Sequence, residues 1–216
     1  FAPIFFTQEA TRQNYFPEWI ITGSALTDTT IFARTYDQAQ WDKAFGISYL
    51  NARYPREQAD AYKVHVWHHG GPPTADNQYA VIYNEGPFPM FTGIHMAGPN
   101  LTPQSWAKGM FSFPPTGAGK VTSAHLSFGD HGIWPFPDLT QLDDVTEIWW
   151  DPRATGEDEV GNPGLGMYRY VDGGKRYLPG KHPKSDPRVF DANKSPTFYD
   201  QRPADERPPE YPHQGH

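Results

Sequence analysis

Three histidines are the first candidates for chemistry in this chain. His65, His68 and His69 are spaced so that one helix would bring them to a common face, where imidazole nitrogens can bind Zn²⁺. The segment lacks the glutamate of the His-Glu-x-x-His zinc hydrolases, and Gly70 ends it. Histidines are also favourable at a helix C-terminus, where their cations face the last carbonyls. We therefore predict a solvated helix end without a metal.

A second candidate set follows a predicted strand. Glu147, Trp149 and Asp151 alternate with apolar residues, so they share one face of the strand. Two carboxylates that flank a tryptophan are typical of sugar-handling sites. Their spacing along the strand is about 13 Å, longer than the separation of about 5–9.5 Å used in glycoside hydrolysis. The pattern predicts an aromatic core strand.

Asp130 and His131 could belong to a catalytic triad. No Gly-x-Ser-x-Gly turn accompanies them, and the glycines at 129 and 132 predict a tight turn.

Two glycine-rich segments do not meet the requirements for nucleotide binding. Gly117–Lys120 resembles the end of a phosphate loop, but Val121 stands where Ser or Thr is needed. Gly161–Gly166 contains Pro163 and precedes a predicted strand instead of a helix. The residues therefore predict no catalytic site and no cofactor.

The composition limits the class of protein. The chain has 216 residues with 7 Trp, 12 Tyr and 14 Phe, enough for an aromatic-rich core, and 20 Gly and 23 Pro, which predict short elements. A net charge of -7 argues against a nucleic-acid partner. There is no Cys, and no apolar run approaches the length of a membrane span.

The N-terminal quarter predicts alternating strands and helices. An apolar strand end at 1–6 precedes a helix over 7–14, and the strand Trp19–Thr22 ends at Gly23. A helix capped by Thr27 or Asp28 follows to about Arg34. This β-α-β-α order predicts a parallel sheet.

Further helices are predicted over 58–67, 77–83, 88–97 and 103–111, the last with Thr102 as its N-cap and Pro103 at its first position. Strands are predicted at 145–151 and 167–171, between Gly/Pro-rich loops. Residues 181–216 form a Pro-rich tail that we expect to be extended or disordered.

Several motifs, taken in order, resemble one known family. These are Tyr15–Trp19, Gln40-Trp41, Ala44–Gly46, Ala97–Pro103 and Trp149–Pro152. Over about residues 1–180 the chain resembles the C-terminal half of actinobacterial ABC-transporter substrate-binding proteins, the branched-chain-amino-acid-binding-like group. The Ala-Gly-x-x-Leu-Thr-Pro step is the most specific of the motifs.

The resemblance implies an α/β protein with the type I periplasmic-binding fold, in which parallel sheets are flanked by helices. A small polar solute would be held between two lobes, without chemistry, and passed to an ABC permease. It further implies a location at the extracellular face of the membrane, as a lipoprotein anchored through an upstream part of the chain. Residues 1–180 would be the C-terminal portion of such a protein.

The general rule for such sheets places ligands beyond the carboxyl ends of the strands. We therefore expect Ala2, Pro3, Gly23, Ser24 and Ala25 to line the cleft, with the Ser24 hydroxyl and backbone N–H groups as donors.

Two alternatives stay open. One is a metal-dependent hydrolase that uses the His65/His68/His69 cluster with Asp130 or His131. The other is a carbohydrate-binding or scaffold protein that uses exposed aromatic rings, such as Trp134, Phe136 and Trp149.

Overall fold

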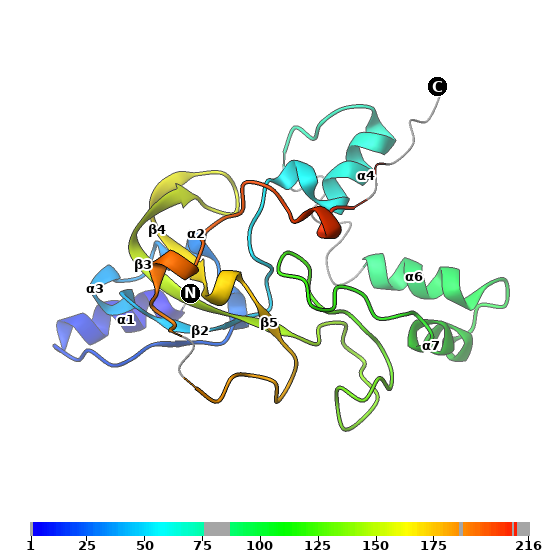
Figure 1. Ribbon diagram of the computed structural model, residues 1–216, viewed down its shortest axis with the longest axis horizontal. Coiled ribbons are helices and arrows are strands. Elements are labelled where there is room, and N and C mark those ends of the chain that lie inside the picture. Colours follow the sequence, from blue (N-terminus) through cyan, green and yellow to red (C-terminus); the bar gives the residue numbers. More distant parts are fainter. Residues whose placement is uncertain (1, 76–86, 186–187, 209, 211–216) are drawn as a thin grey trace. The chain divides into compact units, whose positions relative to one another are not determined.

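The computed structural model describes residues 2–75, 87–185, 188–208 and 210. The helix expected at 77–83 lies outside the described residues. The elements in chain order are α1 (Ala2–Arg12), β1 (Ile20–Ile21), α2 (Thr30–Ala33), α3 (Gln38–Trp41), β2 (Phe45–Ser48), α4 (Asp60–His69), α6 (Pro87–Ala97), α7 (Pro103–Phe111), β3 (Val145–Glu157), β4 (Pro163–Tyr170) and β5 (Arg176–Tyr177) (Figure 1).

The chain divides into two compact units, each made of separate stretches of sequence. The first comprises 1–53, 119–124 and 144–199, and it holds the whole β-sheet with α1, α2 and α3. The second comprises 54–118, 125–143 and 200–216, and it holds α4, α6 and α7.

The sheet of the first unit is mixed, with strand order β1-β2-β3-β4 and β5 paired to β3. β1 and β2 are parallel, as the β-α-β-α reading predicts, whereas β3 is antiparallel to β2, β4 and β5. The expectation of a parallel sheet therefore holds only for β1 and β2. A tight connection of five residues joins β3 to β4, and a connection that short requires antiparallel strands.

An aromatic core lies on one face of β3. Ile148 and Trp150 pack there with Tyr168 and Tyr170, which are their direct cross-strand partners on β4. The helices add Ala33 from α2 and Trp41 from α3, and the core also contains Ile21, Tyr36, Ala44 and Ala52. The sheet is thus flanked by helices, in an α/β arrangement whose core depends on large rings instead of aliphatic side chains.

The N-terminus differs from the expected strand end. α1 begins at Ala2 and includes the apolar run, because Pro3 is tolerated in a first helical turn and no breaker follows before Pro17. Thr7 is fully buried, and its hydroxyl accepts a hydrogen bond of 3.1 Å from the N–H of Asp37. This contact ties α1 to the start of α3.

Sequence signals predict the helices of the second unit well. α4 ends at Gly70, whose φ of 75° is the left-handed conformation that a terminating glycine adopts. α7 has the predicted start: Thr102 is its N-cap, and the Thr102 hydroxyl accepts a 3.1 Å hydrogen bond from the Ser105 N–H.

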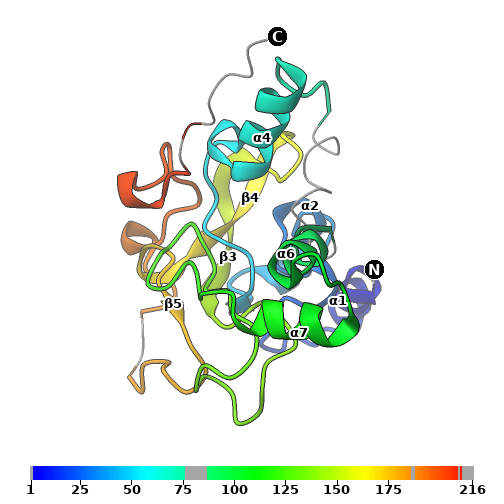
Figure 2. The ribbon, with the colours of Figure 1, turned by 90° about the vertical axis from the view of Figure 1, so that its right-hand side faces the viewer.

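α6 and α7 lie side by side in both ribbon views (Figures 1 and 2). Glycines allow their close approach. A Cβ at Gly93 would lie 2.1 Å from Trp106 Nε1, and one at Gly109 would lie 2.8 Å from Met96 Cβ.

The Pro-rich C-terminal region is largely irregular, with short 3₁₀ turns at Ala192–Lys194 and Ala204–Glu206. It nevertheless contains buried residues: Ser195 is 1% exposed and Arg202 is 5% exposed. Segments of this region therefore pack against the rest of their own units.

Candidate solute site at the ends of two parallel strands

The carboxyl ends of β1 and β2 are held together at one edge of the sheet. Ile20 pairs with Phe45, and Ile21 pairs with Gly46. Gly46 is required here because a Cβ at this position would lie 1.9 Å from the Ile21 carbonyl oxygen. The residues that follow the two strands are consequently neighbours, as ligand-binding loops of open α/β sheets are.

A turn with strained backbone follows β1. Gly23 has φ 75°, and the non-glycine residues Ala25 and Leu26 have φ 53° and 61°. Left-handed conformations cost non-glycine residues about 1–2 kcal/mol each, and such strain gathers at functional sites. Ser24, Ala25 and Leu26 are exposed.

A buried carboxylate lies beside this turn. Asp28 is 6% exposed, and its Oδ2 accepts a 2.6 Å hydrogen bond from the Ser48 hydroxyl at the end of β2. A Cβ at Gly23 would lie 3.2 Å from Asp28 Oδ2 and 3.1 Å from Tyr49 Cδ2. Gly23, Asp28 and Tyr49 therefore meet at the carboxyl edge of the β1–β2 pair.

Only one oxygen of Asp28 is satisfied. Oδ1 is buried and has no hydrogen-bond partner, and the same is true of Asn51 Oδ1, three residues beyond β2. Buried polar atoms are nearly always paired, so each exception requires an explanation. These two exceptions are both hydrogen-bond acceptors.

The surroundings of Asp28 disfavour its charged form. Burial raises the pKa of Asp28, the Ser48 hydrogen bond partly opposes this, and the nearby Glu159 carboxylate adds to the increase. Burial, together with the Asp28 charge, also raises the pKa of Tyr36.

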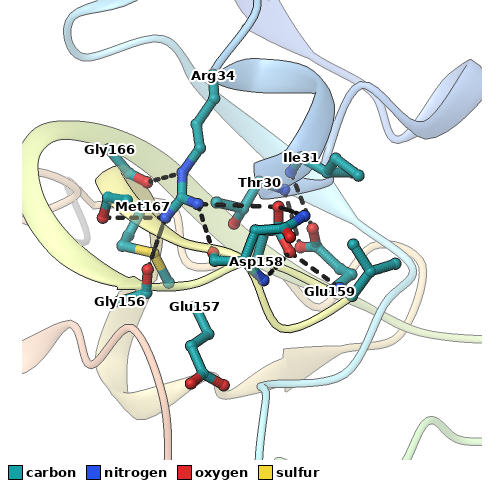
Figure 3. A network of polar contacts seen from close by, with 12 residues as sticks. Thr30, Ile31, Arg34, Gly156, Glu157, Asp158, Glu159, Gly166 and Met167 are labelled. Atoms are coloured by element: carbon teal, nitrogen blue, oxygen red, sulfur yellow. Dashed lines mark hydrogen bonds and ion pairs between the residues drawn. The ribbon is translucent and has the colours of Figure 1, made fainter. Parts of the chain in front are cut away.

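A network of polar contacts positions the helix that follows Asp28 (Figure 3). Glu159 accepts hydrogen bonds from the N–H groups of Thr30 and Ile31, at 2.8 and 2.9 Å, and so occupies the N-terminus of α2. The Arg34 guanidinium donates to carbonyl oxygens of the β3–β4 hairpin, at Gly156, Asn162, Gly164 and Gly166. α2 is thereby joined at both ends to the hairpin.

Tyr168 positions the residue before Asp28. Its hydroxyl donates a 2.6 Å hydrogen bond to the Thr27 carbonyl and accepts one of 3.0 Å from Trp41 Nε1. Burial raises the pKa of Tyr168 well above its usual range, so the hydroxyl keeps its proton. The segment that carries Asp28 is thus held from the core side.

The sequence located this edge but not its central residues. Gly23, Ser24 and Ala25 lie in the turn after β1, where they were expected. Asp28 was considered only as a helix cap, yet Thr29 occupies that position. Ser48 and Asn51 were missed, because only the β1–β2 pairing shows that residues after β2 belong to the same edge.

Ala2 and Pro3 were selected because they were expected to follow a strand. They instead form the first turn of α1, so the strand-end argument does not apply to them.

The histidine cluster forms a helix end, as expected. The His65 and His69 rings lie 4.3 Å apart between centroids, and burial and both neighbouring imidazoles lower the pKa of His65. Within the described residues, no group of three or more His, Cys, Asp or Glu side chains could hold a metal ion. The side chains of His65, His68 and His69 therefore do not form such a group.

The face of β3 that carries Glu147, Trp149 and Asp151 is packed against other side chains, although Glu147 Oε2 and Trp149 Nε1 are buried without a hydrogen-bond partner. Trp149 is 2% exposed and packs against Phe190 with ring centroids 5.6 Å apart. Asp151 accepts a 2.7 Å hydrogen bond from Arg169 Nε. The expectation of an exposed Trp149 ring for carbohydrate binding is wrong, although Phe136 is 64% exposed.

A buried His–Asp pair in the second unit was not predicted. Asp143 accepts a hydrogen bond of 2.6 Å from the Ser127 hydroxyl and one of 3.1 Å from Trp134 Nε1, and its Oδ2 lies 2.8 Å from His125 Nδ1. Ser127 bonds to the carboxylate and not to the imidazole, so these residues do not have the order of a Ser-His-Asp triad. Asp130 and His131, by contrast, form local turn contacts to Gly132 and Phe128.

The fold and the edge site define an α/β protein with a mixed sheet and a half-satisfied buried carboxylate at a strand end. No protein-family model, no curated protein and no solved structure matches the chain. Among the described helices, none has the length and apolar character that crossing a membrane requires.

Proposed function

We propose that this chain binds a small polar solute at the carboxyl edge of β1 and β2, without catalysing a reaction. The observation that carries the proposal is the buried Asp28 carboxylate, with Oδ2 held by Ser48 and Oδ1 left without a partner. An unsatisfied buried acceptor costs about 1–3 kcal/mol. A ligand that donates to it recovers this free energy.

The position of the site supports a binding function. The Gly23–Leu26 turn is exposed, strained and next to Asp28, and Tyr49 at the end of β2 is 44% exposed. An aromatic rim with a polar group beneath it is typical of small-molecule sites. The solute would contact Tyr49, the turn and the Asp28 carboxylate.

The proposal extends to the role implied by the family resemblance. Residues 1–180 would be the C-terminal portion of the solute-binding component of an ABC importer at the extracellular face of the membrane, and the protein would deliver its solute to a permease. Within this proposal, the parallel β1–β2 pair and its helices belong to a type I periplasmic-binding fold, and the antiparallel β3–β4 ladder is an addition to it.

A thermal-shift screen of the whole chain against small polar solutes tests the binding function. A solute that raises the melting temperature should bind less tightly to Tyr49→Ala, by about tenfold for the loss of one aromatic contact. Tyr15→Ala is the matched control, since Tyr15 is an exposed tyrosine that follows α1. Binding that both variants weaken equally, or no binding of any solute, would contradict the proposal.

The importer role has a separate test. Deleting the gene for this protein should abolish cellular uptake of the radiolabelled solute found in the screen, and reintroducing the wild-type gene should restore it. Unchanged uptake would refute delivery to a permease and leave the binding function in place.

A further inference from the structure

We infer that the solute at the β1–β2 edge carries a positively charged nitrogen group, an ammonium or a guanidinium, which donates a hydrogen bond to Asp28 Oδ1. This inference rests on the proposed function and specifies the chemical class of its ligand. It follows from the negative charge of the carboxylates at this edge and from the free hydrogen-bond acceptors there.

The unpartnered atoms at the edge are acceptors. Asp28 Oδ1 and Asn51 Oδ1 are both buried without a hydrogen-bond partner. Asp28 Oδ2 already accepts from Ser48, and the Ser48 oxygen also accepts a 3.0 Å hydrogen bond from the Leu50 N–H. A ligand that bonds to these free acceptors must supply N–H or O–H donors.

The charges around Asp28 favour a cation over a neutral donor. Among the described residues, the charged group that acts on Asp28 is a second carboxylate, Glu159. Tyr36, Tyr168 and Tyr170 are close enough to Asp28 for its charge to affect their pKa values. Burial raises these pKa values further above neutral pH, so all three side chains are uncharged. Asp28 therefore has no neutralising partner within this part of the chain, and a cationic ligand would provide one.

The N-terminus of α2, which would attract an anion, is already occupied. The first N–H groups of α2 bond to Glu159, so the positive end of this short helix is neutralised from within the chain. An anionic solute would also approach the carboxylates of Asp28 and Glu159. The edge thus disfavours anions.

A nitrogen cation fits better than a metal ion. Hard cations such as Ca²⁺ take six to eight oxygen ligands. The described residues contain no group of three or more His, Cys, Asp or Glu side chains suited to a metal. A guanidinium has five N–H donors and an ammonium has three, so either can donate to Asp28 Oδ1 and keep its other N–H groups in water.

Isothermal titration calorimetry on the whole chain tests this inference with pairs of compounds that differ chiefly in charge: methylguanidinium and methylurea, and putrescine and 1,4-butanediol. Glutarate and CaCl₂ complete the set. The cation of a pair should bind about 10- to 100-fold more tightly than its neutral partner, as expected for a charge-assisted hydrogen bond. In Asp28→Asn this preference should fall below about threefold, because the carboxylate is gone.

Asp42→Asn is the control, since it removes the same charge from an exposed position after α3 and should keep the preference. Tighter binding of methylurea, the diol or glutarate would overturn the cation inference while supporting solute binding. Tight binding of Ca²⁺ that depends on Asp28 would overturn it in favour of a metal site. No binding by any compound of the set or of the solute screen would overturn the proposed function itself.

The pH dependence gives a second readout. Because burial raises the pKa of Asp28, a cation should bind with release of a proton and with an affinity that increases as the pH rises toward neutrality. Titrations in two buffers of different ionisation enthalpy measure this proton release. Asp28→Asn should release none, whereas equal release by both proteins would contradict a role for Asp28.

Discussion

Asp28 of the first unit and Asp143 of the second are closely matched buried carboxylates. They are 6% and 3% exposed, and each accepts a 2.6 Å hydrogen bond from a buried serine hydroxyl. They differ in the remaining contacts. Asp143 also bonds to Trp134 and pairs with His125, whereas Asp28 has a free oxygen and a second carboxylate nearby.

The difference separates a structural carboxylate from a binding carboxylate. Both carboxylate oxygens of Asp143 have partners within its own unit, namely His125, Ser127 and Trp134. Among the described side chains, Asp28 accepts a hydrogen bond from Ser48 alone, and burial raises its pKa. A buried group that is poorly satisfied in the free protein is one that a ligand can stabilise.

The largest effect on stability should come from removal of Asp143. Asp143→Ala removes the carboxylate that the buried His125 and Ser127 and the half-buried Trp134 all contact, and we expect a loss of about 3 kcal/mol in the free energy of unfolding. Urea denaturation followed by tryptophan fluorescence measures it. Asp143→Asn, which keeps the size of the side chain, should lose less, and a loss under about 1 kcal/mol in Asp143→Ala would show that Asp143 does not organise this cluster.

The two serines provide a smaller, matched test. Ser127→Ala leaves Asp143 with two partners, and Ser48→Ala leaves the Asp28 side chain with none among the described side chains. Each should cost about 1 kcal/mol in urea denaturation. Ser48→Ala should also raise the pKa of Asp28 further, because the Ser48 hydrogen bond lowers it, and carboxyl chemical shifts during an NMR pH titration would report it. No change at Asp28 would show that Ser48 does not stabilise its charged form.

Local signals made much of the fold predictable. Thr102 and Pro103 mark the start of α7 and Gly70 marks the end of α4, because caps and terminating glycines act within a few residues. The strand at 145–151 was recognised from its aromatic and β-branched residues, and it continues to Glu157. These predictions needed no information about distant contacts.

The antiparallel β3–β4 ladder and the two buried carboxylates depend on long-range pairing. Asp28 and Ser48 are separated by 20 residues, and Ser127 and Asp143 by 16. Nothing in the residues around Asp28 shows that one of its oxygens is satisfied and the other is not. The turn at Gly23–Ala25 could be placed because a strand followed by glycine is a local pattern, whereas its acidic partner could not.

The smallest effect on stability, and the sharpest test of the comparison, should come from Asp28→Asn. The pKa of Asp28 is higher in the folded protein than in the unfolded chain because burial disfavours the carboxylate. Between these two pKa values the folded state holds more protons than the unfolded state, so stability falls as the pH rises through that window. The Asp28 contribution is fully present below the ordinary aspartate pKa and is lost above the raised one.

Asp28→Asn removes this pH dependence and should change the free energy of unfolding by no more than about 1 kcal/mol. Its stability relative to the wild type should therefore improve as the pH increases from 4 to 7, in urea denaturation at each pH. Exposed Asp42→Asn corrects for the change in net charge. If Asp28→Asn instead destabilised the protein increasingly toward pH 7, Asp28 would be a stabilising ion, as a satisfied carboxylate is, and its free oxygen would no longer indicate a ligand.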